Sequence, residues 1–418
     1  MRGARVAAPE RAALVGLSAG RARRLEAERS MDELGGLAEA AGAQVVLRVL
    51  QERSRPDPST FLGAGKIVTL AASCAETAAD VVIFDSELTP AQLGQIEEQV
   101  GRKIIDRTQL ILDIFARRAR TREGKLQVEL AQLKYLLPRL VGAGAALSRL
   151  GGGIGTRGPG ETKLEADRRR IRSRIHALSE DIEQVRGRRA QLRERRRKAS
   201  VPTVALVGYT NAGKTTLFNV LTRADAAVSD ALFVTLDPLV RQLHLPDRRE
   251  LLVSDTVGFI DRLPHALVAA FRATLEEVAD ADLILHVIDA SVPDRERRIR
   301  AVREVLEEVG ATDVALLEVY NKCDALTPDE RRRLPEQDAA ALCISALQRD
   351  GIAELVDTIA SRLALDVRRV TLTFDPDSPE DRERIARLYR HGRVLVHEAR
   401  DGCISIVADV PRRLVPRL

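Results

Sequence analysis

The feature that most constrains this chain is an octapeptide rich in small residues, Gly208-Tyr209-Thr210-Asn211-Ala212-Gly213-Lys214-Thr215. It follows an apolar run at 204–207 and precedes an amphipathic stretch at 216–221. A strand, such a loop and a helix in this order curl backbone N–H groups around phosphate oxygens. We therefore predict a P-loop nucleotide site in which Lys214 meets the β- and γ-phosphates and the Thr215 hydroxyl binds Mg²⁺. The alternative is a chance glycine turn, which the motifs further along the chain argue against.

A second motif points to the γ-phosphate. The string Asp255-Thr256-Val257-Gly258 closes an apolar strand at 251–253. In that place the Asp255 carboxylate can hold Mg²⁺ through a water, and the Gly258 N–H can meet the γ-phosphate and report its presence. An ordinary turn is the alternative for this segment.

A third segment, Phe233-Val234-Thr235-Leu236-Asp237, lies in the loop between the first helix of this domain and the next strand. There the Thr235 hydroxyl can ligate the metal only while GTP is bound, although Thr235 can also be an ordinary strand residue. The catalytic candidates are Lys214, Thr235 and Gly258. The Mg²⁺ candidates are Thr215, Thr235 and, through a water, Asp255.

The fourth motif, Asn321-Lys322-Cys323-Asp324, follows a buried strand at 314–319 and predicts the base. The Asp324 carboxylate can accept from both N1–H and the 2-amino group of guanine, whereas adenine would leave the anion unpaired. Asn321 is expected to fix the loop, and the Lys322 stem to cover one face of the base. The string Ser345-Ala346-Leu347 is expected to add a backbone donor to O6. Together the four motifs predict binding of GTP and GDP.

One position limits the predicted chemistry. Phe259 follows Gly258, where many signalling GTPases have a glutamine that orients the attacking water. A phenyl ring cannot do this. We therefore predict slow hydrolysis by the isolated chain, accelerated by a partner that completes the site, unless another side chain takes the place of the glutamine.

The whole chain predicts a multidomain α/β protein in four parts. Short apolar runs alternate with helix-like stretches between residues 12 and 116, which indicates an N-terminal parallel α/β domain at 1–120. An antiparallel helical hairpin is expected at 121–200, a P-loop GTPase domain of the Ras-like kind at 201–366, and a small C-terminal α+β domain at 367–418.

The hairpin is predicted from two apolar stripes at helical spacing. The first contains Leu126, Leu130, Leu133, Leu137 and Leu140, and the second contains Leu164, Ile171, Ile175, Leu178, Ile182, Val185 and Leu192. The segment between them, 142–162, holds eight glycines and Pro159, and we expect it to interrupt both helices and form the tip.

Positive charge is concentrated on the second predicted helix of the hairpin. The chain carries 66 Lys and Arg against 61 Asp and Glu, so its net charge is only +5. Residues 167–198 alone contain thirteen Lys and Arg against five acidic residues. This density suits a phosphate backbone, and Arg149 and Arg157 at the tip are expected to meet structured RNA. A solvated coiled-coil face is the alternative.

Other classes of protein are disfavoured by the sequence. The four cysteines are far apart and indicate neither a disulfide framework nor a zinc site. No apolar run reaches the roughly 18 residues that a membrane-spanning helix needs, and the first 30 residues lack the apolar core of a secretory signal. We expect a cytoplasmic protein, a monomer without a membrane partner.

These residues together resemble the HflX family of ribosome-associated GTPases. The resemblance covers residues 56–66, the helix at 125–140, the tip at 151–163 and the nucleotide domain from 208 onward, and the first-domain string and the tip are the parts specific to the family. The resemblance implies binding to the large ribosomal subunit and its RNA, with the tip and Lys163 near the peptidyl transferase centre. It also implies ribosome-stimulated hydrolysis of GTP and separation of stalled ribosomes into subunits, notably under heat stress.

Three alternatives remain at this stage. Gly63-Ala64-Gly65-Lys66 resembles a phosphate loop but lacks its full spacing, so a tight turn before a helix competes with a second nucleotide site and an ATP-linked remodelling activity. An RNA-binding remodeller or ribosome-assembly factor timed by GTP shares every motif. A membrane-recruited signalling GTPase would need a lipidation signal, and none is readable.

Overall fold

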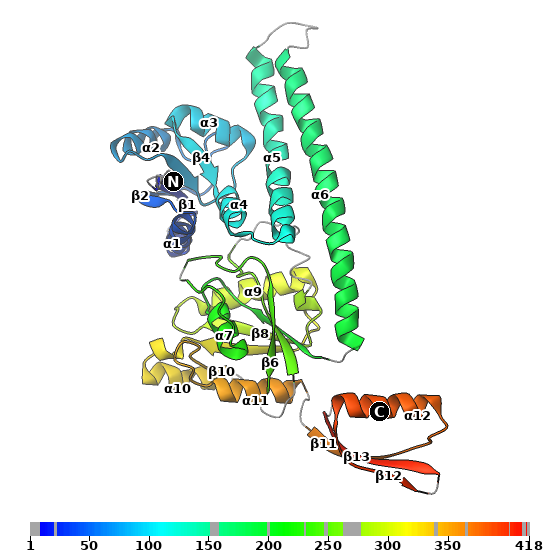
Figure 1. Cartoon of the computed structure of the whole chain (residues 1–418). Helices are drawn as coiled ribbons and strands as arrows, with labels where there is room; N and C mark the ends of the chain where they lie inside the picture. Colours follow the sequence, from blue (N-terminus) through cyan, green and yellow to red (C-terminus); the bar gives the residue numbers. More distant parts are fainter. Residues whose placement is uncertain are drawn as a thin grey trace, which may run out of the picture.

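The computed structural model describes residues 9–20, 23–150, 159–198, 201–229, 231–245, 250–261, 277–337, 342–363, 367–400, 402–411 and 415. It confirms the predicted α/β architecture. Figure 1 shows an N-terminal α/β layer beside a long helical hairpin, a second α/β layer below both, and a small C-terminal sheet with one helix. The limits at residues 120, 200 and 366 fall between helices and strands, and we retain them as proposed domain boundaries.

The N-terminal layer is a four-stranded parallel sheet in the order β2-β1-β3-β4. Its strands are β1 (Arg11–Ser18), β2 (Gln44–Glu52), β3 (Val81–Phe84) and β4 (Lys103–Asp106). Alternate residues of β1 face opposite ways, as strand geometry requires. Leu14 packs with α1 (Arg24–Ala40) and α4 (Arg107–Arg118), while Ala13 and Val15 pack with α2 (Ala64–Glu76) and α3 (Pro90–Val100).

The hairpin consists of α5 (Arg122–Leu150) and α6 (Pro159–Lys198), which lie side by side (Figure 1). Leu130, Leu178 and Ile182 are buried between them, which confirms the predicted contact between the stripes. Each helix is longer than expected. The predicted break lies within 142–162, but its limits are wrong, because α5 continues to Leu150 and α6 begins at Pro159. A glycine lowers helix propensity by only about 1 kcal/mol, and proline is well accepted in the first turn.

The central layer is a six-stranded sheet in the order β10-β9-β8-β5-β7-β6, in which only β6 runs antiparallel to its neighbour. Its strands are β5 (Thr203–Val207), β6 (Leu239–His244), β7 (Glu250–Asp255), β8 (Leu283–Asp289), β9 (Leu316–Asn321) and β10 (Leu342–Cys343). The described helices around it are α7 (Lys214–Thr222), α9 (Arg295–Val309), α10 (Pro328–Gln337) and α11 (Ile352–Arg362). Helices α7 and α11 cover one face, and α9 covers the other.

The C-terminal part is a three-stranded antiparallel sheet in the order β11-β13-β12. Strands β11 (Val367–Phe374), β12 (Arg393–Arg400) and β13 (Cys403–Pro411) carry α12 (Pro379–His391) on one face. Leu388 of the helix is buried against Phe374 and Ile406 of the strands.

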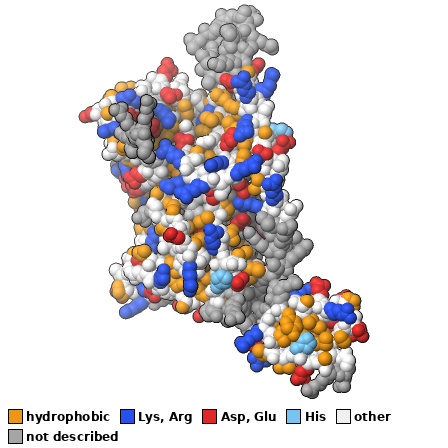
Figure 2. All heavy atoms as spheres, in the orientation of Figure 1, with side chains coloured by type: hydrophobic (Ala, Val, Ile, Leu, Met, Phe, Trp, Pro, Cys, Tyr) orange, Lys and Arg blue, Asp and Glu red, His pale blue; other side chains and the backbone are white. Residues whose placement is uncertain are grey.

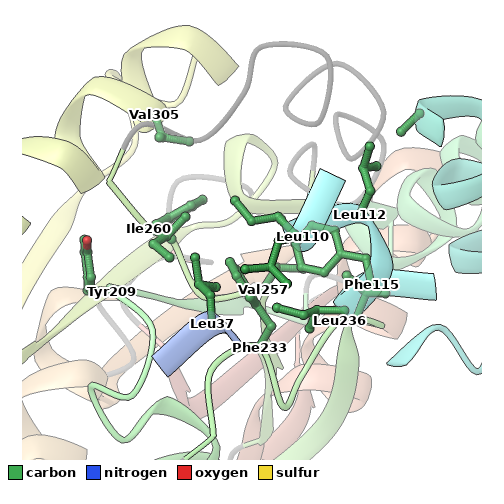
Figure 3. Close-up of a cluster of buried hydrophobic side chains, with 14 of the residues drawn as sticks. Leu37, Leu110, Leu112, Phe115, Tyr209, Phe233, Leu236, Val257, Ile260 and Val305 are labelled. Carbon is green, nitrogen blue, oxygen red and sulfur yellow. The ribbon is translucent and has the colours of Figure 1, made fainter. Parts of the chain in front are cut away.

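One apolar core is shared by the N-terminal layer and the central layer. Figure 3 shows Leu37 and Phe115 of the first meeting Phe233, Val257 and Ile260 of the second. The rings of Phe115 and Phe233 meet edge to face, with 4.7 Å between their centroids. Because this core includes Tyr209, Phe233 and Val257, which belong to three of the predicted nucleotide motifs, the N-terminal layer helps to position the candidate site.

Candidate nucleotide site

The predicted P-loop lies between β5 and α7 and forms one wall of a pocket of about 300 Å³. Gly213 has φ +90°, and a side chain there would collide with the Asn321 amide. A side chain on Gly208 would collide with the main-chain oxygen of Val287 in β8. Both glycines are therefore required by the fold itself, in addition to any role toward phosphates.

Most of the predicted site residues line this pocket. They are Thr210, Asn211, Gly213, Lys214, Thr215, Phe233, Val234, Thr235, Thr256, Gly258, Asn321, Lys322, Asp324, Ala346 and Leu347. The structure adds Thr216, Ala227, Val228, Ser229, Ala231 and Ala325 to the lining. No motif in the sequence marks the stretch at 227–229, so only its place in the loop before Phe233 could have indicated it.

The Lys214 ammonium is buried at the base of the loop. Its Nζ donates to the main-chain oxygens of Gly208, at 3.0 Å, and Tyr209, at 2.8 Å. Burial lowers the pKa of Lys214 to about 8, against a smaller opposing effect of the Asp255 carboxylate. Phosphate oxygens would supply the negative charge that this desolvated ammonium lacks.

Three oxygen-bearing side chains from three motifs meet beside Lys214. The Thr215 hydroxyl lies 2.8 Å from the Asp255 Oδ2 atom and 2.8 Å from the Thr235 hydroxyl. Burial raises the pKa of Asp255, and its Oδ1 atom has no hydrogen-bond partner among the described residues. Two hydroxyls and a partly unsatisfied carboxylate are a donor set that fits Mg²⁺, which prefers hard oxygen ligands.

Gly258 lies against the P-loop. A side chain there would approach the Cα of Thr210 to 3.0 Å and the Nζ of Lys214 to 3.2 Å, so a larger residue would separate the two segments. Phe259 is 1% exposed and packs into the shared core. Its N–H donates to the Gly208 oxygen at 3.1 Å, and its own oxygen accepts from Thr210 N–H at 2.7 Å. The backbone is thus fixed with the phenyl ring directed away from the pocket.

The other end of the pocket is organised by Asn321. Its Nδ2 donates to the Ala212 oxygen and its Oδ1 accepts from the Ala346 N–H, both at 2.9 Å. One buried amide therefore joins three predicted motifs. Lys322 makes an ion pair of 2.8 Å with Asp289, while Asp324 is exposed at the pocket wall.

The remaining predicted site residues do not line the pocket; they are Gly208, Tyr209, Ala212, Leu236, Asp237, Asp255, Val257, Cys323 and Ser345. Leu236 and Val257 are buried in the shared core. The Asp237 side chain turns toward α5, and the Tyr209 side chain toward α1. Asp255 lies behind the pocket wall, where it accepts from Thr215.

The predicted RNA contacts fall where the structure describes little. Arg157 lies outside the described residues, and the side chains of Arg149 and Lys163 are not described, although both residues belong to helices. Further down the hairpin, Lys and Arg side chains are spread along its visible face (Figure 2). Arg174 of α6 forms a two-pronged ion pair with Glu129 of α5, at 2.7 and 2.9 Å.

None of the helices within the described residues is long and apolar enough to cross a membrane.

Three family models match successive parts of the chain. One described as "GTP-binding GTPase N-terminal" matches residues 28–116, and one described as "GTP-binding GTPase Middle Region" matches 118–196. One described as "50S ribosome-binding GTPase" matches residues 203–322. The three matches cover the N-terminal layer, the hairpin and most of the layer that holds the pocket.

Relatives of known name match between 72% and 94% of the chain. GTPase HflX of Caldanaerobacter subterraneus subsp. tengcongensis is 47% identical over 94% of this chain and 90% of that protein. GTPase HflX of Alkalihalophilus pseudofirmus is 55% identical over 72% of this chain and 71% of that protein. GTPase HflX of Escherichia coli is 45% identical over 91% of this chain and 89% of that protein. The chain therefore belongs to the HflX family and is an enzyme that hydrolyses GTP.

Proposed function

We propose that this GTPase binds the large ribosomal subunit and separates stalled or idle ribosomes into subunits, under the control of its bound nucleotide. The observation that carries the proposal is the attachment of the basic hairpin to the nucleotide domain. Arg189 near the end of α6 pairs with Glu123 of α5 at 2.7 Å and with Glu277 of the central layer at 3.3 Å. A hairpin fixed at its base can transmit a change in the nucleotide domain to whatever its tip touches.

Within the pocket, we assign the phosphate end to Lys214, Thr215, Thr235, Asp255 and Gly258. Mg²⁺, when bound there, would neutralise charge on the β- and γ-phosphates. The Thr215 and Thr235 hydroxyls would ligate it, with Asp255 acting through a water. Lys214 would hold the same phosphates, and the Gly258 N–H would donate to the γ-phosphate only in the GTP state.

At the base end, Asp324 would accept from the two guanine donors while Asn321 keeps the loops in place. The Ala346 N–H is already occupied by Asn321 Oδ1 at 2.9 Å. A backbone donor to O6 from this loop would therefore come from Leu347, whose side chain is 79% exposed at the pocket edge. An aspartate that faces a ring amide and an amine gives a strong preference for guanine.

The partner is proposed from charge. Arg149, Arg157, Lys163 and the arginines of α6 would contact phosphates of ribosomal RNA, which binds such a surface through release of counterions. The description "50S ribosome-binding GTPase" of the matching family model supports the same partner. We propose a monomer that acts in the cytoplasm and responds to heat stress.

Hydrolysis is proposed to be slow until the ribosome is bound. Phe259 is buried and its backbone is held to the P-loop at both ends, so its ring cannot reach a water beside the γ-phosphate. A group from the ribosome, or a rearrangement that binding causes, would then complete the site.

The test is a ribosome sedimentation profile with GTP, GDP and a non-hydrolysable GTP analogue, using the full chain. We expect co-sedimentation with the large subunit and loss of the 70S peak in the GTP and analogue samples, but not with GDP. Equal profiles in all three nucleotides would contradict the proposal. Binding confined to immature subunits would instead support a GTP-timed assembly factor.

A further inference from the structure

A buried network of charged groups joins the N-terminal layer to the P-loop. The Tyr209 hydroxyl, on the P-loop, donates to one oxygen of Glu33 on α1, and Arg107 on α4 donates to the other. Arg107 also donates to Asp85 at 3.0 Å. Tyr209 is 5% exposed and Arg107 is 3% exposed, while the side chain of their common partner Glu33 is 12% exposed, so these contacts are largely removed from water. In such surroundings each bond is stronger and each unpaired group more costly than at the surface.

The network converges on the main chain of Asp261, three residues after Gly258. The Asp261 N–H donates to the Tyr209 hydroxyl at 2.8 Å, and the Asp261 main-chain oxygen accepts from Arg107 at 3.1 Å. The Asp261 side chain accepts from Arg297 of α9 at 2.9 Å. A single residue is therefore held by groups from the P-loop, the N-terminal layer and the central layer.

The Tyr209 hydroxyl has both of its hydrogen-bonding roles filled. Burial and the nearby Glu33 carboxylate raise the pKa of Tyr209, so the phenol keeps its proton and donates it to Glu33 while accepting from Asp261. Replacing only this hydroxyl would leave a carboxylate oxygen and an N–H, both of half-buried residues, without that partner.

The segment from 258 to 261 is thus attached to the P-loop at two points. Phe259 pairs with the loop through two backbone hydrogen bonds, and Asp261 is attached through Tyr209. Gly258 lies just before these two points and beside Lys214. The position of its N–H relative to the P-loop therefore depends on how firmly Phe259 and Asp261 are held.

We infer that Tyr209, Glu33 and Arg107 are positioning residues for GTP hydrolysis. They hold the segment at 258–261 against the P-loop, so that Gly258 stands where the γ-phosphate is expected. The N-terminal layer is in this sense part of the GTPase machinery, although Glu33 and Arg107 do not line the nucleotide pocket. The inference rests on the role proposed for Gly258, but not on the ribosome as partner.

Tyr209→Phe is the test variant, because it removes one hydroxyl and keeps the ring that fills the core. Hydrolysis is measured under single-turnover conditions without ribosomes, and the affinities for GTP and GDP are measured separately on the same full-length protein. We expect the rate constant to fall at least about tenfold, since small misplacements at a reacting centre are costly. GDP affinity should stay within about twofold, because GDP has no γ-phosphate to meet Gly258.

The matched control is Tyr135→Phe. Tyr135 is also 5% exposed, but its hydroxyl donates to the Asp106 carboxylate of the N-terminal layer at 2.6 Å, and its ring lies under Arg139 of the hairpin. This variant removes a comparable buried hydrogen bond, so it should lower thermal stability to a similar extent as Tyr209→Phe. Its rate of hydrolysis should equal that of the wild type.

Glu33→Gln provides a second measurement, since it acts from the other layer. If Glu33 works partly through Tyr209, the double variant should lose less activity than the product of the two single losses. A wild-type rate in Tyr209→Phe, or equal losses in Tyr209→Phe and Tyr135→Phe, would overturn the inference. So would a parallel fall in GDP affinity, which would indicate damage to the whole P-loop. A wild-type chain that fails to bind GTP would instead overturn the proposed nucleotide site.

Discussion

Asp237 holds Thr121, the residue whose hydroxyl caps the first hairpin helix by accepting from the Gly124 N–H at 3.0 Å. One carboxylate oxygen of Asp237 accepts from the Thr121 hydroxyl, and the other accepts from the Thr121 N–H at 2.9 Å. The same oxygen accepts from the Arg120 N–H at 2.9 Å. Asp237 lies only two residues after Thr235, the proposed ligand of Mg²⁺. The segment expected to respond to GTP is therefore the segment that holds the base of the hairpin.

Replacing Asp237 by alanine should weaken this connection. Thr121 remains to cap the helix, and the three hydrogen bonds that are lost are exposed, so we expect a fall in stability of only about 1 kcal/mol. We also expect the difference in ribosome binding between the GTP-analogue and GDP states to shrink, because the hairpin loses a contact to the nucleotide-dependent segment. Sedimentation with each nucleotide measures this difference.

Ser378→Ala is the control for this prediction. The Ser378 side chain caps α12 in the C-terminal part, far along the chain from the nucleotide motifs. It should lower stability by a similar amount and leave the difference between nucleotide states unchanged. If Asp237→Ala behaves in the same way as Ser378→Ala, the contact between Asp237 and Thr121 has no part in nucleotide response.

Replacing Asp324 by asparagine should change the base that is recognised. An amide in place of the carboxylate cannot accept from both guanine donors, but its NH₂ group can donate to the 2-oxygen of xanthine. We expect GTP affinity to fall by about a hundredfold or more, with binding of xanthosine triphosphate gained. The exposed Asp329, which pairs only loosely with Arg332 at 3.9 Å, gives the control Asp329→Asn, and this variant should keep the preference for guanine.

Much of the fold could be predicted from the periodicity of apolar residues in the sequence. Strands such as Val81–Phe84 and helices such as Pro90–Val100 have the limits that their apolar runs predict, because burial and turn residues act locally there. The length of α5 could not be predicted in this way. Its Gly142 and Gly144 weaken a helix without breaking it, and helix formation through this stretch is a cooperative property of 29 residues rather than of two.

The sequence motifs were enough to predict the candidate pocket. They were not enough to predict how the pocket is connected to the rest of the molecule. Thr215, Thr235 and Asp255 are far apart in sequence, and fixed motif order was enough to predict that they meet. Glu33 and Arg107 belong to no motif, and both look like ordinary residues of surface helices in the sequence. Only the contact between the two layers shows them buried beside Tyr209.

Replacing Thr235 by alanine should impair the hydrolysis of bound GTP and leave the binding of GDP unchanged. In the proposed site the Thr235 hydroxyl would ligate Mg²⁺ only when GTP is bound, whereas the Thr215 hydroxyl would ligate it in both states. Thr235→Ala should therefore slow hydrolysis by about tenfold or more while leaving Mg²⁺-dependent GDP affinity unchanged.

Thr215→Ala is the comparison for this prediction, and it should weaken binding of both nucleotides. Removal of Mg²⁺ by a chelator should reproduce the Thr215→Ala pattern in the wild type. Equal effects of the two substitutions on GDP affinity would contradict the assignment of separate roles.

His286 should make the central layer sensitive to acid. This residue of β8 is 1% exposed; burial lowers its pKa to about 3, assisted by the positive charges of Arg303 and Lys214. The Glu318 carboxylate lies 3.8 Å from its Nδ1 atom but does not reverse the shift. Between pH 6.5 and 3 the unfolded chain binds a proton that the folded chain does not. The free energy of unfolding therefore falls as the pH falls, by about 2 kcal/mol between pH 7.5 and 5 from this group alone.

His286→Gln should remove that contribution, since glutamine does not titrate. Urea unfolding of both proteins at pH 7.5 and pH 5 measures this contribution. Between the two pH values, the free energy of unfolding of the variant should fall by about 2 kcal/mol less than that of the wild type. His176→Gln, on the exposed face of α6, is the control and should lose as much as the wild type, because that side chain is 79% exposed. Equal pH dependence in His286→Gln and the wild type would mean that the buried imidazole is protonated at no cost, and that its surroundings stabilise the cation.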